Sequence, residues 1–230
     1  MWTIILTRSE EESATWLSAQ IKGVSFLCCP VVEYQPIADV VLPSLDRYRW
    51  LVLTSGRAAE IFYSLVSPDD CADLKIACVG ARAAVSAGRC DVQGASAADL
   101  AEKMIPLLAS GDRILHPCSA EARQELPDLL SSAGFTIDRV PLYRPEPFED
   151  ATPFLSALKR SDGVLFFAPS QVRAAFRHHG AGEALRHVTI LAIGRTTAGA
   201  IPKPYPVAVL DSPTPEGLAR VLEGGLHEAR

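Results

Sequence analysis

The amino-acid sequence predicts an α/β protein with two parallel β-sheets, and three observations indicate this fold class. Short apolar runs alternate with helical patterns along the chain, which is typical of parallel α/β sheets. The pattern occurs twice, because residues 50–62 are similar to 163–176, and residues 75–84 are similar to 189–198. Extended, proline-rich segments follow corresponding units of the repeat, at 30–36 and 140–147.

Individual elements follow from local patterns. Strands are expected at 3–7, 24–29, 50–54, 75–79, 113–116, 136–140, 163–167, 189–193 and 207–210. Helix starts are indicated by hydroxyl residues at Ser9, Ser96 and Thr214. Glu12 and Asp99 stand three residues after the first two and give the pattern of a capping box, whereas a proline follows Thr214.

The proline-rich segments predict how the repeats divide between two lobes. Duplication alone favours two tandem domains joined near Gly111. Prolines hold themselves and the preceding residue in extended geometry, which suits strands that cross between two bodies. We therefore expect linkers at about 31–38 and 141–147, a discontinuous first lobe of 1–35 with 147–230, and an inserted second lobe of 38–142. Each lobe then has five strands, and the second has its units in circularly permuted order.

Composition limits the classes of function. The chain has 230 residues, 48% of them hydrophobic, which is enough for sizeable cores, and its net charge of −5 does not indicate a nucleic-acid-binding surface. Six cysteines without a C-x-x-C pair predict reduced thiols rather than disulfides or metal ligands. The sequence shows neither a signal-peptide pattern nor an apolar run near ~18 residues. We therefore expect a cytoplasmic monomer that binds neither nucleic acid nor membrane.

Small, hydroxyl and arginine residues follow four predicted strands. These turns lie at 54–57, 80–82, 168–170 and 194–197. The carboxyl ends of parallel strands and the N-termini of helices bind anions, and Arg57, Arg82 and Arg195 add positive charge. One such turn is ordinary for a strand-to-helix connection. Four such turns, two in each copy of the repeat, predict a polyanionic ligand held between the lobes. No P-loop or G-x-G-x-x-G fingerprint is present.

Two tyrosines occupy equivalent positions in the proline-rich segments. Tyr34 and Tyr143 are expected either to pack beside the linkers or to face the ligand, where a phenol can donate a proton to a leaving hydroxyl. His116 is expected to be structural. Cys118 is reactive only if it lies at a helix start, and no base partner for it is evident.

Motifs in order along nearly the whole chain resemble those of the uroporphyrinogen-III synthase family. They are Leu6-Thr-Arg8, Leu53-Thr-Ser-Gly-Arg57, Val79-Gly80, Val140-Pro-Leu-Tyr143, Phe167-Ala-Pro-Ser170, Ile193-Gly-Arg-Thr-Thr-Ala198 and Ser212-Pro-Thr-Pro-Glu-Gly-Leu218. The resemblance implies two flavodoxin-like lobes with parallel five-stranded sheets, joined by a two-stranded linker. It also implies that the N-terminal strands complete the lobe built from the C-terminal half.

The resemblance implies a cyclising hydro-lyase of tetrapyrrole and heme biosynthesis. Its substrate is hydroxymethylbilane, a linear tetrapyrrole with eight carboxylates, and no metal or organic cofactor is used. Loss of the terminal hydroxyl as water leaves an azafulvene, which the last pyrrole attacks through its substituted carbon to give a spiro intermediate. Fragmentation and recombination then invert ring D and give uroporphyrinogen III. A transient hand-over of substrate from hydroxymethylbilane synthase also fits this role.

The resemblance assigns residues by position. Tyr143 matches a linker tyrosine that assists departure of the hydroxyl, so it is the expected general acid. The expected substrate-binding residues are Arg8, Thr54, Ser55, Arg57, Gly80, Ala81, Arg82, Arg123, Ser170, Gly194, Thr196 and Thr197. Ala83 and Ala168 depart from the family pattern, which commonly has Thr and Ser there.

Two other classes of function fit the same pattern of lobes. A cytoplasmic two-lobed module that binds or senses a small molecule without catalysis is the main alternative. A nucleotide-dependent enzyme is the third, and ATP or NAD would then stabilise the protein.

Overall fold

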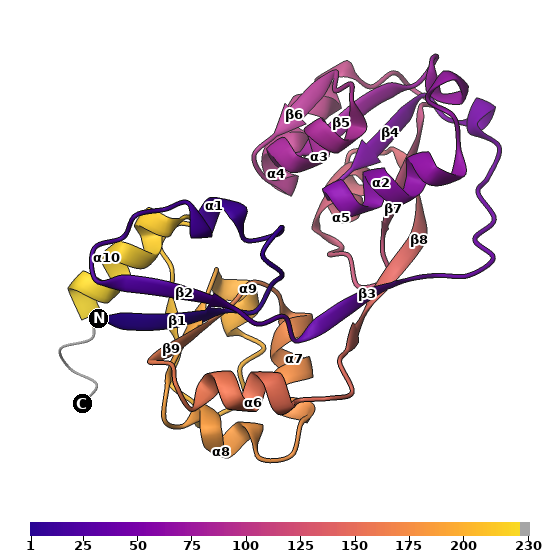
Figure 1. The fold of residues 1–230 in the computed structure, drawn as a ribbon. Coiled ribbons are helices and arrows are strands. Elements are labelled where there is room, and N and C mark those ends of the chain that lie inside the picture. Colours follow the sequence, from indigo (N-terminus) through magenta and orange to yellow (C-terminus); the bar gives the residue numbers. More distant parts are fainter. Residues whose placement is uncertain (226–230) are drawn as a thin grey trace. The chain divides into compact units, whose positions relative to one another are not determined.

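The computed structural model describes residues 1–225 and has two predominantly parallel β-sheets flanked by helices (Figure 1). Contacts along the chain divide it into two compact units. Unit 1 comprises Met1–Glu33 with Glu146–Arg230, and unit 2 comprises Tyr34–Pro145. The predicted α/β class with parallel sheets is confirmed. Within residues 1–225, no helix has the length and apolarity needed to cross a membrane.

Unit 1 contains a sheet of five parallel strands. These are β1 (Trp2–Leu6), β2 (Val24–Cys28), β9 (Gly163–Phe166), β10 (Thr189–Ala192) and β11 (Ala208–Val209). Its helices are α1 (Ala14–Leu17), α6 (Thr152–Leu158), α7 (Pro169–Arg177), α8 (Ala181–Leu185), α9 (Arg195–Ala198) and α10 (Pro215–Gly225). β1 lies between β2 and β9, so the N-terminal strands complete a sheet whose other strands come from the C-terminal part of the chain.

The core of unit 1 is formed by side chains of the central strands. Ile4, Leu6 and Leu165 are completely buried, as expected for parallel strands that have both faces covered. Trp16 of α1 packs edge-on against Phe167, with ring centroids 5.3 Å apart. This contact fixes the end of β9 against α1.

Unit 2 contains a sheet of six strands rather than the five expected. In chain order these are β3 (Val32–Pro36), β4 (Trp50–Leu53), β5 (Lys75–Val79), β6 (Val92–Gly94), β7 (Arg113–Ser119) and β8 (Thr136–Pro147). The helices are α2 (Gly56–Leu65), α3 (Gly80–Ala87), α4 (Ala97–Met104) and α5 (Glu125–Ser132), with single 3-10 turns at Leu45–Arg47, Pro68–Cys71 and Ile105–Leu107.

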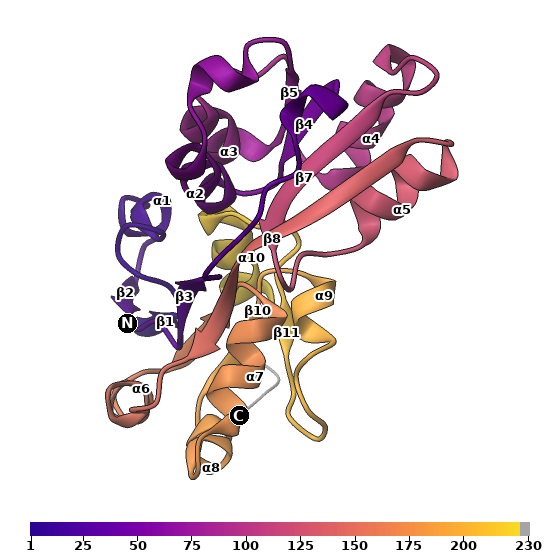
Figure 2. The ribbon, with the colours of Figure 1, turned by 90° about the vertical axis from the view of Figure 1, so that its right-hand side faces the viewer.

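The sixth strand of unit 2 comes from an expected linker segment. β3 pairs with β8, which is drawn as one long strand in Figure 2. Backbone hydrogen bonds extend along the two segments, from Ile37 N to Leu142 O at 2.8 Å and from Phe148 N to Val31 O at 3.3 Å. The two crossings of the chain are therefore strands that bond to each other, as the two-stranded linker predicts.

The two sheets have the same topology after circular permutation. The order β2, β1, β9, β10, β11 in unit 1 corresponds to β8, β7, β4, β5, β6 in unit 2, and both follow the flavodoxin-like order 2-1-3-4-5. The registers agree, because Gly163 lies opposite Ile4 and Thr189 just as Trp50 lies opposite Ile114 and Lys75. The predicted permutation is confirmed. Gly163 and Trp50 thus mark equivalent positions of the repeat.

Two predicted helix caps are present. Ser96 Oγ accepts a hydrogen bond from Asp99 N at 3.1 Å at the start of α4. Thr214 Oγ1 accepts from Gly217 N at 3.2 Å at the start of α10. Each bond satisfies a backbone N–H that has no partner within its helix.

The predicted helix start at Ser9 is wrong. Ser9 Oγ does accept from Glu12 N at 3.3 Å, but this bond closes only a turn, and α1 begins at Ala14. The capping-box pattern therefore acts here in a loop. It stabilises the bend after β1 rather than a helix.

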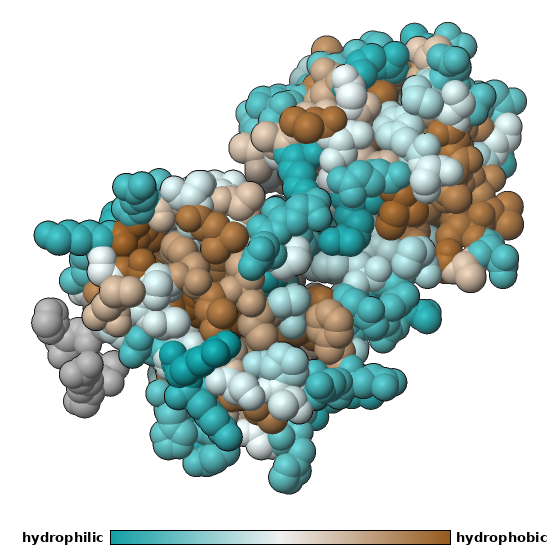
Figure 3. Space-filling model, viewed as in Figure 1, coloured by the Kyte–Doolittle hydropathy of each residue, from teal (hydrophilic) through white to brown (hydrophobic). Residues whose placement is uncertain are grey.

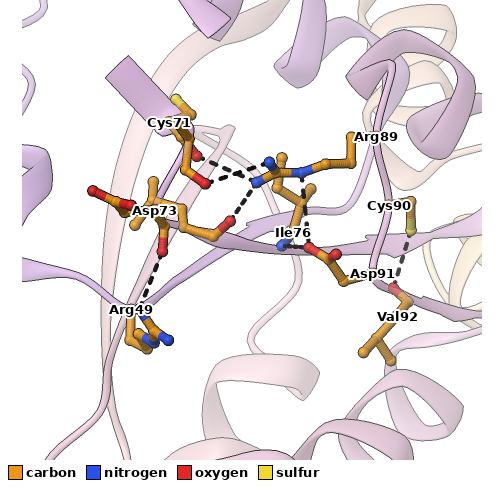
Figure 4. A network of polar contacts seen from close by, with 10 residues as sticks. Arg49, Cys71, Asp73, Ile76, Arg89, Cys90, Asp91 and Val92 are labelled. Carbon is orange, nitrogen blue, oxygen red and sulfur yellow. Dashed lines mark hydrogen bonds and ion pairs between the residues drawn. The ribbon is translucent and has the colours of Figure 1, made fainter. Parts of the chain in front are cut away.

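Arg89 fixes the turn that leads into β5 (Figure 4). Its guanidinium group donates to the carbonyl oxygens of Cys71, at 3.3 Å, and of Leu74. Asp91 lies 3.9 Å from Arg89 Nε and accepts from Ile76 N at 2.6 Å. This network lies at the amino end of β5, so Arg89 has a structural role away from the turns predicted to bind ligand.

Apolar surface is visible on unit 2 near α2 and the segment between β3 and β4 (Figure 3). Val41 is 88% exposed and Leu65 is 49% exposed. The neighbouring Val40, Leu42 and Leu45 pack against the core of unit 2. The segment is thus attached to the unit through alternate side chains.

Candidate active site

The N-terminus of α2 brings predicted ligand-binding residues together in unit 2. Ser55 is the N-cap of α2 in extended geometry, and its hydroxyl oxygen accepts from Ala58 N at 3.1 Å. Thr54 precedes it at the carboxyl end of β4, and Arg57 follows in the first turn. These residues lie where free backbone N–H groups and the helix dipole favour an anion.

Tyr143 lies against this helix terminus. Its phenol oxygen is 3.1 Å from Ser55 Oγ, and the residue is 6% exposed. Tyr34 packs edge-on against it with centroids 5.8 Å apart, and the Arg57 guanidinium stacks 4.1 Å from the centroid of the Tyr34 ring. We call Tyr34, Ser55, Arg57 and Tyr143 the tyrosine cluster. Both tyrosines named from the proline-rich segments therefore belong to one group of contacts.

Strand pairing positions Tyr143. The register between β7 and β8 shifts at Cys118 and Ser119, so that Ser119 lies opposite Tyr143. Ala120 N donates to Tyr143 O at 2.8 Å and fixes the backbone beyond the shift. Such irregularities redirect side chains at strand ends.

The tyrosine cluster can orient the hydroxyl proton of Tyr143. Ser55 Oγ already accepts from Ala58 N, and its own proton can be donated to the phenol oxygen of Tyr143. In that arrangement the phenol of Tyr143 donates its own proton to an acceptor other than Ser55. A phenol held in this way is suited to general acid catalysis.

A second polar pair lies at the carboxyl end of β4, beside the middle of β7. His116 is 1% exposed, and its Nε2 lies 3.1 Å from Thr54 Oγ1, while its Nδ1 has no partner among residues 1–225. Burial, reinforced by the positive charge of Arg139, lowers the pKa of His116 from 6.5 to about 4. The imidazole is therefore neutral near pH 7. His116 was expected to be structural, and its contact with Thr54 was not predicted.

Close approach of α2 and α3 positions Arg82. A Cβ at Gly56 would lie 2.8 Å from Arg82 Cγ and 2.9 Å from Ser86 Oγ, so glycine leaves room for these side chains. Gly80 begins α3 with φ +77, a conformation that favours glycine. Ala81 and Arg82 are exposed in the same turn.

Three other residues of unit 2 that the sequence analysis named lie in different surroundings from one another. Arg123 is exposed in the turn that follows β7. Ala83 is 1% exposed and lies in the core, so its methyl group is a packing contact. Cys118 lies within β7, not at a helix start, and burial raises the pKa of its thiol, although the hydrogen bond and charge of Arg139 act in the opposite direction. Nothing here activates Cys118.

The predicted residues of unit 1 lie at the carboxyl ends of β1, β9 and β10. The Arg8 guanidinium stacks 4.1 Å from the centroid of the Phe167 ring. Ser170 is half-buried in the first turn of α7. Thr196 is exposed in α9, whereas Thr197 is completely buried and its Oγ1 has no partner among the described residues. Gly194 is the N-cap of α9.

A buried glutamine that the sequence analysis missed holds the turn after β9. Gln171 Oε1 accepts from Phe167 N at 2.8 Å and lies 2.8 Å from Thr7 Oγ1. The Thr7 hydroxyl is also 2.8 Å from Leu165 O, so one proton serves these two acceptors. These bonds tie the ends of β1 and β9 to α7. The signal in the sequence is a glutamine at the third position of a predicted helix, where it can reach back to the preceding turn.

A cavity of about 500 Å³ lies at the opposite edge of the sheet of unit 2, near the amino ends of β4 and β7. Its lining includes Arg47, Arg49 and Arg113 together with four aspartates. Arg113 bonds to Asp138, so part of this charge is already compensated. The aspartates of the lining offset the charge of the arginines, so this cavity does not favour a polyanionic ligand. Among residues 1–225, no group of three or more His, Cys, Asp or Glu side chains is arranged to hold a metal ion.

The fold defines a two-unit α/β protein with flavodoxin-like strand order, a class in which ligands bind at the carboxyl ends of parallel strands. The family profile described as uroporphyrinogen-III synthase HemD matches residues 17–220. This chain therefore belongs to the uroporphyrinogen-III synthase family.

Individual relatives agree with this assignment. A uroporphyrinogen-III synthase of Chlorobaculum parvum is 24% identical over 220 residues, which cover 88% of this chain and 89% of the relative. A chloroplastic uroporphyrinogen-III synthase of rice is 26% identical over 249 residues, covering 99% of this chain and 80% of the relative. The crystal structure of uroporphyrinogen-III synthetase from Helicobacter pylori has a TM-score of 0.67 at 16% identity, covers 97% of this chain and 99% of its own, and supports the fold.

Proposed function

We propose that this chain catalyses the closure of hydroxymethylbilane to uroporphyrinogen III, with loss of water and inversion of ring D. Membership of the family supports the reaction, and the names of the relatives point to the same product. The observation that carries the catalytic role is the contact between Tyr143 and Ser55 at the N-terminus of α2.

Tyr143 acts as the general acid in this proposal. The bond between the terminal carbon and its hydroxyl oxygen breaks as the phenol proton passes to that oxygen, so that water leaves, Tyr143 becomes a phenolate and the azafulvene remains as its N-protonated cation. Ser55 donates to the phenol oxygen and stabilises the negative charge that develops there. The last pyrrole then attacks through its substituted carbon, and the spiro intermediate rearranges to the type III isomer.

Carboxylates of the substrate bind to both units in this proposal. In unit 2, Thr54, Arg57 and Arg82 supply a hydroxyl group and two guanidinium groups, and N–H groups at Gly80 and Ala81 add donors. Arg123 is a further cation of that unit. In unit 1, the binding groups are those near Arg8, Ser170, Gly194 and Thr196. The buried hydroxyl of Thr197 does not favour direct contact.

Product analysis tests the reaction. Purified protein is incubated with freshly generated hydroxymethylbilane, and the products are oxidised and separated by isomer. Excess type III product over a protein-free control is expected. Only the uninverted type I isomer, which unassisted closure gives, would contradict the proposal. Binding without turnover would instead support a non-catalytic module, and stabilisation by ATP or NAD would support a nucleotide-dependent enzyme.

The setting of the reaction is also proposed. Six free cysteines, four of them buried, suit a reducing compartment such as the cytoplasm. We propose a monomer that receives its substrate from hydroxymethylbilane synthase by transient hand-over. Sedimentation of the purified protein, alone and with that enzyme, checks both points. A stable dimer would contradict the monomeric state. Sedimentation that does not change at any concentration of hydroxymethylbilane synthase would contradict the hand-over.

A further inference from the structure

We infer that His116 is a positioning residue that orients the Thr54 hydroxyl toward a substrate carboxylate. The Nε2–H of the imidazole donates to Thr54 Oγ1, so the threonine proton points to a different acceptor. The inference rests on the proposed binding role of Thr54. It adds a residue from a strand distant in sequence to the group that binds substrate.

The hydrogen-bond partners of His116 indicate that its neutral imidazole is protonated on Nε2. A neutral imidazole has one N–H donor and one acceptor nitrogen. Nδ1 of His116 is buried without a partner among residues 1–225, whereas Nε2 lies 3.1 Å from Thr54 Oγ1. A proton on Nδ1 would leave a buried donor unpaired, and unpaired buried donors are rarer than unpaired acceptors. The proton therefore belongs on Nε2.

The tautomer determines what Thr54 can do. A threonine hydroxyl has one proton and can accept other hydrogen bonds through its oxygen. His116 is the partner that the described residues give Thr54, and Thr54 itself is half-buried at the end of β4. Because the oxygen accepts from Nε2, its proton is left for an incoming acceptor. A carboxylate accepts such a proton readily, whereas a cation does not.

Unit 1 shows that the fold does not require a polar pair at this place. By the matched strand registers, Leu6 occupies the position of His116, and Phe167 occupies that of Thr54. Both residues of unit 1 are buried in its apolar core. A buried imidazole nitrogen without a hydrogen-bond partner destabilises the folded state relative to satisfied polar groups. The polar pair of unit 2 thus opposes stability at a position where the same architecture accepts apolar side chains.

The kinetic test uses substitutions that separate the donor from the ring. His116→Leu installs the residue of unit 1 and removes the donor. We expect KM for hydroxymethylbilane to rise by ~3- to 10-fold, the effect of losing one hydrogen bond to a charged group, with kcat nearly unchanged. His116→Gln, whose amide reaches the place of Nε2, restores KM, whereas His116→Asn does not. Exposed His179→Leu is the matched control.

A double-mutant cycle tests whether His116 acts through Thr54. In a Thr54→Val background, His116→Leu should cause no further rise in KM. If the two substitutions raise KM independently and multiplicatively in folded proteins, the inference is overturned. Restoration of KM by His116→Asn instead of His116→Gln would also overturn it. Melting curves of all variants exclude loss of fold as the cause of a raised KM.

Nitrogen NMR of protein with ¹⁵N-labelled histidine tests the tautomer without substrate. We expect His116 to be protonated on Nε2 at neutral pH, with assignment by comparison with His116→Leu. Protonation on Nδ1 would overturn the inference even if the wild-type protein makes the type III isomer. Absence of the type III isomer from the wild-type reaction would instead refute the proposed function, so the two failures are distinguishable.

Discussion

The hydroxyl of Tyr143 is the group whose removal most directly tests the chemistry. Tyr143→Phe keeps the ring that packs against Tyr34 and removes the oxygen beside Ser55. We expect kcat for ring closure to fall by ~10-fold or more, about the low end for general acid catalysis, with little change in melting temperature. The isomer assay in single turnover measures the rate.

Tyr34→Phe is the matched control for this substitution, since it removes a phenol oxygen from the same cluster. Its kcat should remain much closer to the wild-type value. A fully active Tyr143→Phe protein would remove Tyr143 from the proton transfer and leave it only a packing role.

Candidate site residues could be named from the sequence where a local motif contains them. The turn at 54–57 and the tyrosine at 143 follow from the duplicated pattern and the proline-rich segments. The contacts that organise them join residues far apart in the chain, since Thr54 and His116 are separated by 62 positions and Ser55 and Tyr143 by 88. Neither distance nor tautomer can be obtained from spacing alone, because each depends on strand order and register.

At the scale of elements, α7 lacks a cap that its counterpart α2 has. Ala168 and Ser55 are equivalent N-cap residues with nearly the same geometry, at φ −152, ψ 153 and φ −155, ψ 148. Gln171 already reaches back from the third helical position. A serine hydroxyl at position 168 would add an acceptor for a free backbone N–H of the first turn, so we expect Ala168→Ser to raise the free energy of unfolding by about 0.5–1 kcal/mol. Urea unfolding followed by circular dichroism measures the change.

The N-cap of α6 provides a control. Ala151 has φ −84 and ψ −5, outside the extended geometry that lets a serine side chain cap a helix. Ala151→Ser should thus be nearly neutral. Equal gains from the two substitutions would show that added surface polarity, not capping, explains the result at Ala168.

Prediction of elements depended on how much of each strand is apolar. The four-residue β4 and β9 are completely buried and were placed within one residue. β6 was missed because Val92–Gly94 offers only three residues, one of them apolar and large. β7 and β8 extend beyond their predicted ends through proline-containing segments, since strand pairing and not local propensity determines those ends.

At the scale of the whole molecule, His116 should make the protein sensitive to acid. Its pKa of about 4 in the folded state lies below the ordinary value of 6.5, because burial and Arg139 oppose protonation. Between these values the unfolded chain binds more protons, so the free energy of unfolding falls as pH falls. The loss that His116 contributes is about 3 kcal/mol across that window and is absent above pH 6.5.

Chemical unfolding at a series of pH values between 4 and 7 tests this linkage. His116→Leu should flatten the acid side of the stability profile, whereas exposed His179→Leu should leave its shape unchanged. Parallel profiles for wild type and His116→Leu would assign the acid sensitivity to other groups.

The discontinuous sheet of unit 1 has a consequence for synthesis on the ribosome. β1 and β2 are synthesised before β9, yet β1 pairs with β9, as the register of Ile4 opposite Gly163 shows. Unit 2 is continuous from Tyr34 to Pro145 and is complete before then. Until β9 arrives, one edge of β1 with Ile4, Ile5 and Leu6 lacks its native neighbour. Nascent β1 consequently has an exposed, apolar strand edge that chaperones can recognise while the inserted unit folds.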